Sequence, residues 1–238
     1  MGWQQVVMTM DTSAPDTRVE HDGRRTPRAW LVVAGVEVAL GTAAVIADLA
    51  LPTLVLLLLA GLSLALRREG PASLGLRRAP LSLVPKMLAF AAAWSLFQLG
   101  VTMPVANHVS GTRQDLSAFA GLEGDLGMLV TLLVLSWTLA ALGEELAYRG
   151  FLLTRMSQVL GSGRLAVAVA VVATSVLFGV AHSEQGAIGV LVVSLDGLAF
   201  AWLRLHHGTL WAPVLAHGFN NTLGFVTFFL VGPVHALW

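Results

Sequence analysis

From residue 29 onward the chain is a succession of apolar runs, several of them long enough to cross a lipid bilayer. A transmembrane helix needs about 20 consecutive, mainly apolar residues. Only 12% of the 238 residues are charged and 56% are hydrophobic, whereas soluble domains average about 25% charged residues. The sequence therefore predicts an all-α protein, a polytopic bundle of transmembrane helices, and excludes an ordinary soluble domain.

The apolar runs divide into about seven spans, with a range of six to eight. The predicted spans cover residues 29–49, 51–66, 82–104, 126–158, 164–182, 186–204 and 209–231. Asp48 and Pro52 mark a tight turn between the first two spans, and residues 105–125 are expected to form a polar loop. Basic residues concentrate on alternate connections, so the positive-inside rule places the N-terminus in the cytoplasm.

The domain organisation follows from the same pattern. Residues 1–28 are polar and mixed in charge, which predicts a disordered cytoplasmic tail, and residues 29–238 form the transmembrane domain. Lys86 is the only lysine, and this preference for arginine, together with abundant alanine, valine, leucine and glycine, is typical of a GC-rich bacterial genome. We therefore expect an integral protein of the bacterial cytoplasmic membrane, with the lipid bilayer as a partner.

Composition and missing motifs remove several classes of function. The formal net charge is zero and no basic stripe with interleaved aromatic residues occurs, so no nucleic-acid partner is expected. The chain has no cysteine, which excludes disulfides, thiolate metal sites and a cysteine nucleophile. The sequence also lacks His-Glu-x-x-His and Gly-x-Ser-x-Gly, the usual zincin helix and serine elbow.

Three short polar clusters lie within or at the end of the apolar runs in the second half of the chain. They are Glu144-Glu145-Leu146-Ala147-Tyr148-Arg149, Phe178-Gly179-Val180-Ala181-His182 and His217-Gly218-Phe219-Asn220-Asn221. A charge at the bilayer centre costs about 2.5–3.5 kcal/mol even on the lenient insertion scale. We therefore expect these side chains to face one another or a water-filled cavity, which predicts a catalytic site inside the membrane.

In the first cluster, Glu145 and Arg149 are four residues apart and share one face of a helix, where they are expected to form an ion pair. Glu144 lies about 100° around the helix from Glu145 and is left over for another role. An alternative is that both glutamates pair with Arg149 and merely fix helix packing. The cluster alone does not separate these two interpretations.

The second and third clusters repeat the same spacing. Phe178 lies four residues before His182, and His217 lies four residues before Asn221, with Asn220 as a competing partner. Taken singly, such pairs are more often structural contacts between helices than catalytic groups. Together with the spare glutamate they provide a carboxylate, two imidazoles and an amide, the groups that can activate a water molecule and stabilise an oxyanion.

In this order, Glu-Glu-x-x-x-Arg (144–149), Phe-x-x-x-His (178–182) and His-x-x-x-Asn (217–221) resemble the motifs of the CPBP intramembrane proteases. This family, also called Abi or CAAX protease and bacteriocin-processing, includes the type II CAAX prenyl endopeptidase. Residues 208–221 resemble its final motif over their whole length. The resemblance covers about 126–224, the expected catalytic core, whereas the first hundred residues match only in being transmembrane.

The resemblance implies a role for each matching residue. Glu144 would be the general base and would act with His182 on the attacking water. His217 and Asn221 would donate hydrogen bonds to the tetrahedral oxyanion. Three further residues would support this set: Glu145, Arg149 and Phe178.

The resemblance leaves the use of a metal open, since members of the family are often labelled metalloproteases. If Zn²⁺ is bound, its ligands would be Glu144, His182 and His217, with water as the fourth. Asn221 suits an oxyanion donor better than a metal ligand, which favours a mechanism without an obligatory metal.

The expected function is that of an intramembrane endopeptidase acting on a peptide or a membrane protein, with CAAX processing as the activity of eukaryotic relatives. A proton-coupled carrier is an alternative, because intramembrane Glu, Asp and His also mark proton relays. Carriers usually show repeated halves, whereas all three clusters here lie in the second half. A non-catalytic scaffold or bacteriocin immunity protein is a third interpretation.

Asp196 lies in the middle of the run 186–204 and belongs to none of these motifs. We expect it to pair with an arginine or a histidine across the bundle. A position on the wall of the cavity is the less favoured alternative.

Overall fold

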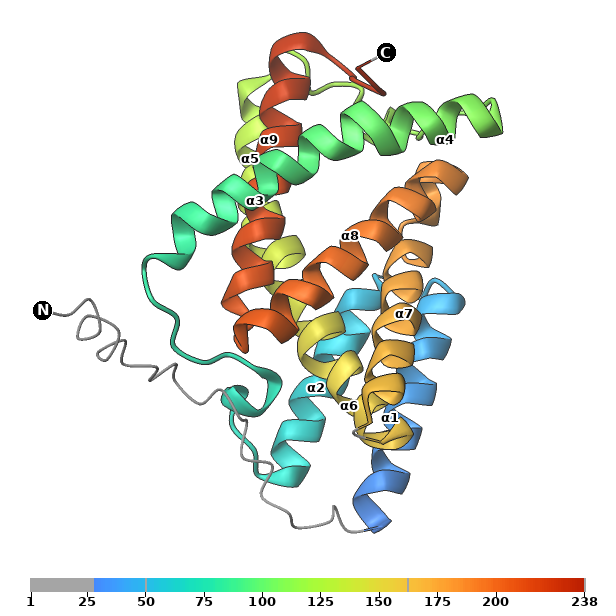
Figure 1. Ribbon diagram of the computed structural model, residues 1–238, viewed down its shortest axis with the longest axis vertical. Helices are drawn as coiled ribbons and strands as arrows, with labels where there is room; N and C mark the ends of the chain where they lie inside the picture. The colour runs from blue at the N-terminus through green and yellow to red at the C-terminus, as the bar shows by residue number, and fades with distance from the viewer. Residues whose placement is uncertain (1–27, 50, 162, 238) are drawn as a thin grey trace, which may run out of the picture.

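The computed structural model describes residues 28–49, 51–161 and 163–237, and over these ranges the protein consists of helices and connecting turns (Figure 1). The predicted all-α class is confirmed, since no strand occurs within these ranges. The predicted tail over residues 1–28 lies outside them, apart from Arg28, the first residue of α1.

Seven apolar helical stretches make up the described bundle. Five of them are long and apolar enough to cross a membrane: α1 (Arg28–Ile46), Leu83–Ser110, Leu126–Leu160, Ser183–His207 and α9 (Trp211–Val231). The other two, α2 (Pro52–Arg67) and α7 (Arg164–Val180), have 16 and 17 residues. At about 1.5 Å per residue they are shorter than the roughly 30 Å hydrocarbon core of a bilayer. Crossings by these two helices therefore stay a prediction.

The stretch Leu83–Ser110 contains α3 (Leu83–Phe97), a π-helical turn η2 (Gln98–Thr102) and α4 (Met103–Ser110). The prediction of a loop over 105–125 is wrong at its start, because the helix continues through Pro104 to Ser110. Pro104 lies in the first turn of α4, where a missing backbone N–H is tolerated. The remainder of the connection contains the short helix η3 (Ser117–Phe119).

The stretch Leu126–Leu160 carries the first polar cluster. It consists of α5 (Leu126–Leu135), η4 (Ser136–Leu152) and α6 (Leu153–Leu160), and η4 is π-helical over 17 residues. π-Helical segments are mostly single turns and are frequent at functional sites. η4 packs against both α2 and α9, and its last residues are buried, so the polar cluster lies in the interior of the bundle.

Two further connections position the first and the second cluster. The short helix η1 (Pro71–Leu74) follows α2 and contacts η4. The helix α7 ends at Val180, and a turn containing η5 (Ser183–Gln185) leads into α8 (Gly186–His207). The helices α7 and α8 approach closely at Gly197, where an added Cβ would lie 2.8 Å from Ser175 Cα.

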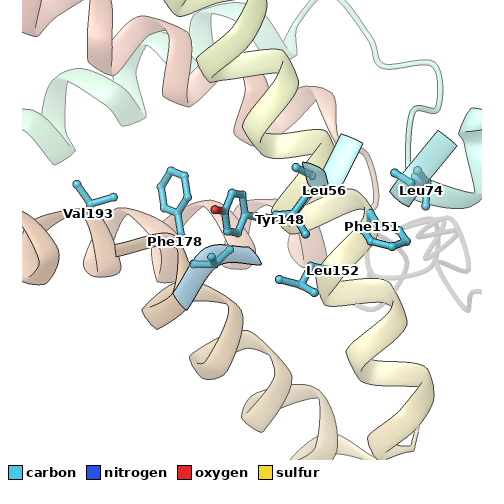
Figure 2. Packing of buried hydrophobic residues seen from close by; sticks show 10 residues of the cluster. Leu56, Leu74, Tyr148, Phe151, Leu152, Phe178 and Val193 are labelled. Atoms are coloured by element: carbon cyan, nitrogen blue, oxygen red, sulfur yellow. The ribbon is translucent and has the colours of Figure 1, made fainter. Parts of the chain in front are cut away.

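A buried apolar cluster fixes η4 relative to α7 (Figure 2). Tyr148 and Phe151 of η4 pack with Phe178 of α7, Leu56 of α2 and Leu74 of η1, and each is at most 2% exposed. The rings of Tyr148 and Phe178 meet edge to face with centroids 5.0 Å apart. The first two polar clusters are therefore attached to one rigid core.

A second set of contacts between helices is ionic. Glu37 of α1 is 8% exposed and lies 3.2 Å from Arg67 Nη2 and 3.4 Å from Arg155 Nε. Arg155, on α6, also reaches Glu69 at 3.2 Å. Pairing of this kind makes the burial of charge tolerable, and the network ties α1, α2 and α6 together.

Candidate active site

Glu145 and Arg149 form a buried ion pair on η4. Arg149 Nη1 donates to Glu145 Oε1 at 3.0 Å, and the side chains are 2% and 0% exposed, respectively. The guanidinium also lies 4.0 Å from the centroid of the Phe178 ring, a cation–π contact. Within residues 28–49, 51–161 and 163–237, Arg149 pairs with no other carboxylate. The interpretation in which both glutamates bind it therefore fails, and Glu144 is left over.

The carboxylate of Glu145 also holds His217 of α9. His217 Nδ1 lies 3.0 Å from Glu145 Oε1, so Arg149 and His217 share a single oxygen atom. An ionised carboxylate only accepts hydrogen bonds, so Nδ1 is the donor. The other ring nitrogen, Nε2, lies 4.0 Å from Glu144 Oε2.

Glu144 presents an unsatisfied carboxylate oxygen to this histidine. Its Oε2 is enclosed and has no hydrogen-bond partner in the described part of the chain. The distance of 4.0 Å to His217 Nε2 is too long for a direct hydrogen bond and is typical of groups that a water molecule can bridge. Buried polar atoms are normally paired, so this oxygen is available to bind a water molecule or a substrate group.

His182 lies in the turn after α7 and not within the helix. Its Nδ1 is 2.8 Å from the backbone oxygen of Phe178, and the two rings meet edge to face at 4.9 Å. Because a carbonyl oxygen only accepts, Nδ1 carries the proton and Nε2 is the acceptor in the neutral ring. Among the described residues no carboxylate lies within 4.0 Å of His182, so the histidine next to Glu144 is His217.

The two neighbouring asparagines of α9 have different partners. Ser95 Oγ of α3 donates to Asn220 Oδ1 at 2.7 Å, so Asn220 is engaged in a contact between helices. The side chain of Asn221 makes no hydrogen bond to any described residue. Of the two candidates left open by the sequence, Asn221 is therefore the one with a free amide.

One cavity of about 460 Å³ joins these groups. All four predicted catalytic residues line it: Glu144, His182, His217 and Asn221. Phe178 lies on its wall too, whereas Glu145 and Arg149 do not and act on it through their contact with His217. The three polar clusters, distant in the sequence, thus meet on the wall of one pocket whose lining is otherwise mainly apolar.

The cavity wall contains polar residues outside the three clusters: Gln98, Gln114, Glu184, Gln185 and Asp196. Gln114 Nε2 donates to Gln185 Oε1 at 2.7 Å and ties the connection after α4 to the turn before α8. The sequence analysis identified Asp196 but not Gln98. Gln98 could have been identified, because it is a polar residue inside the apolar run 82–104.

The expectation of a charged partner for Asp196 is wrong. Its carboxylate accepts hydrogen bonds from Trp94 Nε1 at 2.6 Å and from Gln98 Nε2 at 2.5 Å. No arginine, lysine or histidine of the described chain lies within ion-pair distance of it. Neutral donors on α3 and η2 replace the cation, and Asp196 takes the less favoured place on the cavity wall.

The donor set does not fit a zinc ion as it stands. Glu144 Oε2 and His217 Nε2 are 4.0 Å apart and could both contact one ion. The third predicted ligand, His182, does not join them, since no group of three or more His, Cys, Asp or Glu among the described residues could hold a metal. The contact of His217 Nδ1 with Glu145 does not itself count against a metal, because it leaves Nε2 free.

Comparison with known families adds an independent observation. Residues 126–223 match the family model described as "Type II CAAX prenyl endopeptidase Rce1-like". Over this stretch the chain is related to these endopeptidases. The match spans all three polar clusters and agrees with the predicted core of 126–224. Together with the apolar helices, it supports an integral membrane protein related to proteases. Neither the comparison with curated proteins nor that with solved structures gave a match.

Proposed function

We propose that this protein is an intramembrane endopeptidase that hydrolyses a peptide bond with an activated water molecule. The observation that carries the proposal is the single cavity lined by Glu144, His182, His217 and Asn221. The relationship of residues 126–223 to endopeptidases supports it independently. The proposed substrate is a peptide or a membrane protein that reaches the cavity near the bilayer surface.

In this proposal Glu144 is the general base. Its unpartnered Oε2 takes a proton from a water molecule whose oxygen bonds to the carbonyl carbon of the substrate. When the C–N bond breaks, Glu144 returns that proton to the leaving amine. His182 assists by orienting the water through Nε2, because its Nδ1 is fixed by the backbone oxygen of Phe178.

His217 and Asn221 are the proposed donors to the oxyanion. A protonated His217 donates from both ring nitrogens, from Nδ1 to Glu145 and from Nε2 to the oxyanion. The free amide of Asn221 supplies the second N–H. Arg149 balances the charge of Glu145. The Glu145 carboxylate can therefore hold the His217 ring in position while the Glu145–Arg149 pair carries no net charge.

The proposed topology has seven crossings and a cytoplasmic N-terminus, in a bacterial cytoplasmic membrane. The two short helices α2 and α7 would complete the crossings by local thinning of the bilayer or by extension through their flanking residues.

Peptide cleavage by the purified protein tests the proposed function. The detergent-solubilised protein is incubated with a randomised peptide library, and new termini are identified by mass spectrometry. We expect new termini with the wild-type protein and none with an equal amount of the Glu144→Ala protein. Equal products from both proteins, or none from either, would count against the endopeptidase.

Replacing Asn221 by alanine is expected to lower kcat by about 10²–10³, the usual loss for one oxyanion donor. The effect on KM should be small, because the donor acts mainly on the transition state. Asn220→Ala is the matched control: its amide bonds to Ser95, so the rate should stay near that of the wild type. A larger loss of rate in Asn220→Ala than in Asn221→Ala would reverse the assignment of the two asparagines.

Removal of metal ions is expected to leave the activity unchanged. The described residues contain no cluster of three or more suitable ligands around Glu144 and His217. Cleavage should therefore proceed at the same rate after dialysis against EDTA as before it. Loss of activity with EDTA and its return with Zn²⁺ would show that the ligands rearrange around a metal.

A further inference from the structure

A second polar constellation lies in the same cavity, where α3, η2 and α8 meet. Asp196 is 9% exposed and Gln98 is 5% exposed, and both line the cavity. Asp196 Oδ1 accepts the indole N–H of Trp94 at 2.6 Å and the amide N–H of Gln98 at 2.5 Å. Both donors are neutral, so the carboxylate has no ion-pair partner in direct contact among the described residues, although His217 and Arg149 act on it from a longer distance.

The free atoms of this constellation are all acceptors. Because a carboxylate only accepts, the Gln98 amide nitrogen faces Asp196 and the amide oxygen is its free end. Gln98 Oε1 is buried and has no partner in the described chain. Asp196 Oδ2 makes no hydrogen bond to any described residue, and it is not among the enclosed unpartnered atoms, so it is open to the cavity.

The Asp196 oxygen that opens to the cavity has no donor and is suited to a ligand that carries several N–H groups. An ammonium or a guanidinium has three or five such donors and no acceptor. Buried acceptors without partners are costly to keep, and an intramembrane carboxylate is by default a functional group whose partner is to be found. Here the described residues supply two neutral donors and no ion-pair partner.

The other charges of the cavity favour a cation as well. Its wall carries the carboxylates of Glu144, Glu184 and Asp196 and the imidazoles of His182 and His217, and none of its described residues is a lysine or arginine. With His217 protonated, as proposed above, the three carboxylates still outnumber the cation. A cationic group that enters is therefore attracted, and an anionic one is repelled.

The constellation also lies close to the proposed reaction centre. Asp196 and Phe200 are four residues apart on α8 and so share one face, with Cβ atoms about 5–6 Å apart. The Phe200 ring stacks on His217 with centroids 5.0 Å apart and an interplanar angle of 19°. An extended peptide advances about 3.3–3.6 Å per residue, so Asp196 is within reach of a side chain near the scissile bond.

We propose that Asp196 and Gln98 form a specificity subsite that binds the side chain of a lysine or arginine one or two residues from the scissile bond. The proposal rests on the endopeptidase activity proposed above. It assigns the enzyme a preference for basic peptides, set by the carboxylate of α8, which the amide N–H of Gln98 on η2 holds in place.

The test uses the full-length protein in detergent with two fluorogenic peptide pools. One central position is lysine in the first pool and norleucine, its uncharged counterpart, in the second, and the other positions are random. We expect wild-type kcat/KM to be at least roughly 20-fold higher for the lysine pool, as for loss of one partner of a buried charge pair. In Asp196→Asn, which preserves size and the acceptor for Trp94, this ratio should fall to about one.

Two variants test whether the preference for lysine comes from Asp196 itself, from the overall negative charge of the cavity, or from misfolding of the Asp196→Asn protein. Glu184→Gln removes another carboxylate of the same wall and should keep the preference for lysine, whereas Asp196→Glu restores the charge and should keep a preference of the same sign. A lysine preference that persists in Asp196→Asn, or that is lost in Glu184→Gln, overturns the subsite.

A binding measurement distinguishes failure of the subsite from failure of the proposed function. The Glu144→Ala protein should bind the lysine pool more tightly than the norleucine pool, and the added Asp196→Asn change should abolish the difference. Selective binding without cleavage by the wild type would retain the cation subsite and overturn the endopeptidase. Cleavage of both pools at equal rates would do the reverse.

Discussion

Replacing Glu144 by alanine is expected to abolish peptide cleavage while the protein still folds and inserts normally. A general acid–base group contributes about 10²–10⁴ to the rate, and here it also supplies the proton for the leaving amine. The carboxylate Oε2 has no partner in the described chain, so its removal breaks no hydrogen bond of that atom. The measurement is kcat with a cleavable peptide, alongside a thermal unfolding curve in the same detergent.

Glu184→Ala is the control for this experiment, because it removes a carboxylate from the same cavity wall outside the proposed catalytic set. It should retain most of the activity. Turnover at the wild-type rate in Glu144→Ala would overturn the role of this residue, since no other described carboxylate lies within 4.0 Å of His217 Nε2.

The largest loss of stability is expected from Arg149→Met. Arg149 and Glu145 are both almost fully buried, and the substitution leaves the carboxylate of Glu145 without its guanidinium partner. Removing one member of a buried pair typically destabilises by about 3–5 kcal/mol. The contact of the guanidinium with the Phe178 ring at 4.0 Å is lost as well. We expect a clear fall in the free energy of unfolding, measured by reversible denaturation in mixed micelles.

The double variant Glu145→Leu with Arg149→Met separates charge from packing. Replacing both partners of a buried pair by apolar residues is often neutral or stabilising, so most of the lost stability should return. Cleavage should not return with it, because His217 then lacks the carboxylate at its Nδ1. If Arg149→Met unfolds at the wild-type midpoint, the Glu145–Arg149 ion pair does not contribute to the stability of the fold.

The helical class and the meeting of the polar clusters were predictable, because both follow from the cost of polar groups in lipid. Runs of apolar residues predict helices, and charges inside those runs predict a shared cavity. The pairing of Glu145 with Arg149 also follows from local spacing. The apolar runs and the Glu145–Arg149 spacing are properties of single helices, and the meeting of the clusters follows from the cost of leaving each of them in lipid.

Contacts between distant helices were not predictable in the same way. The choice between Asn220 and Asn221 depends on Ser95, 125 residues before Asn220. The place of Glu37 depends on Arg67 and Arg155, on two other helices. No local pattern specifies which of several compatible partners packs against a given helix face.

The remaining differences between the predicted and the observed structure concern the backbone. An α-helical period was assumed throughout, whereas η4 is π-helical over 17 residues and Gln98 begins a π-helical turn. His182 lies in a turn beyond α7, and the histidine beside Glu144 is His217. Apolar composition does not distinguish these helix types, since it reports on burial and not on the hydrogen-bond register.

The shared oxygen of Glu145 has a consequence for biogenesis. His217 and Asn221 belong to α9, the last helix of the described chain, and Glu144 and Glu145 lie some seventy residues earlier. During synthesis the earlier helices therefore enter the translocon with only half of the set. On the mechanism proposed above, a nascent chain is therefore inactive at the insertion site until the final helix docks.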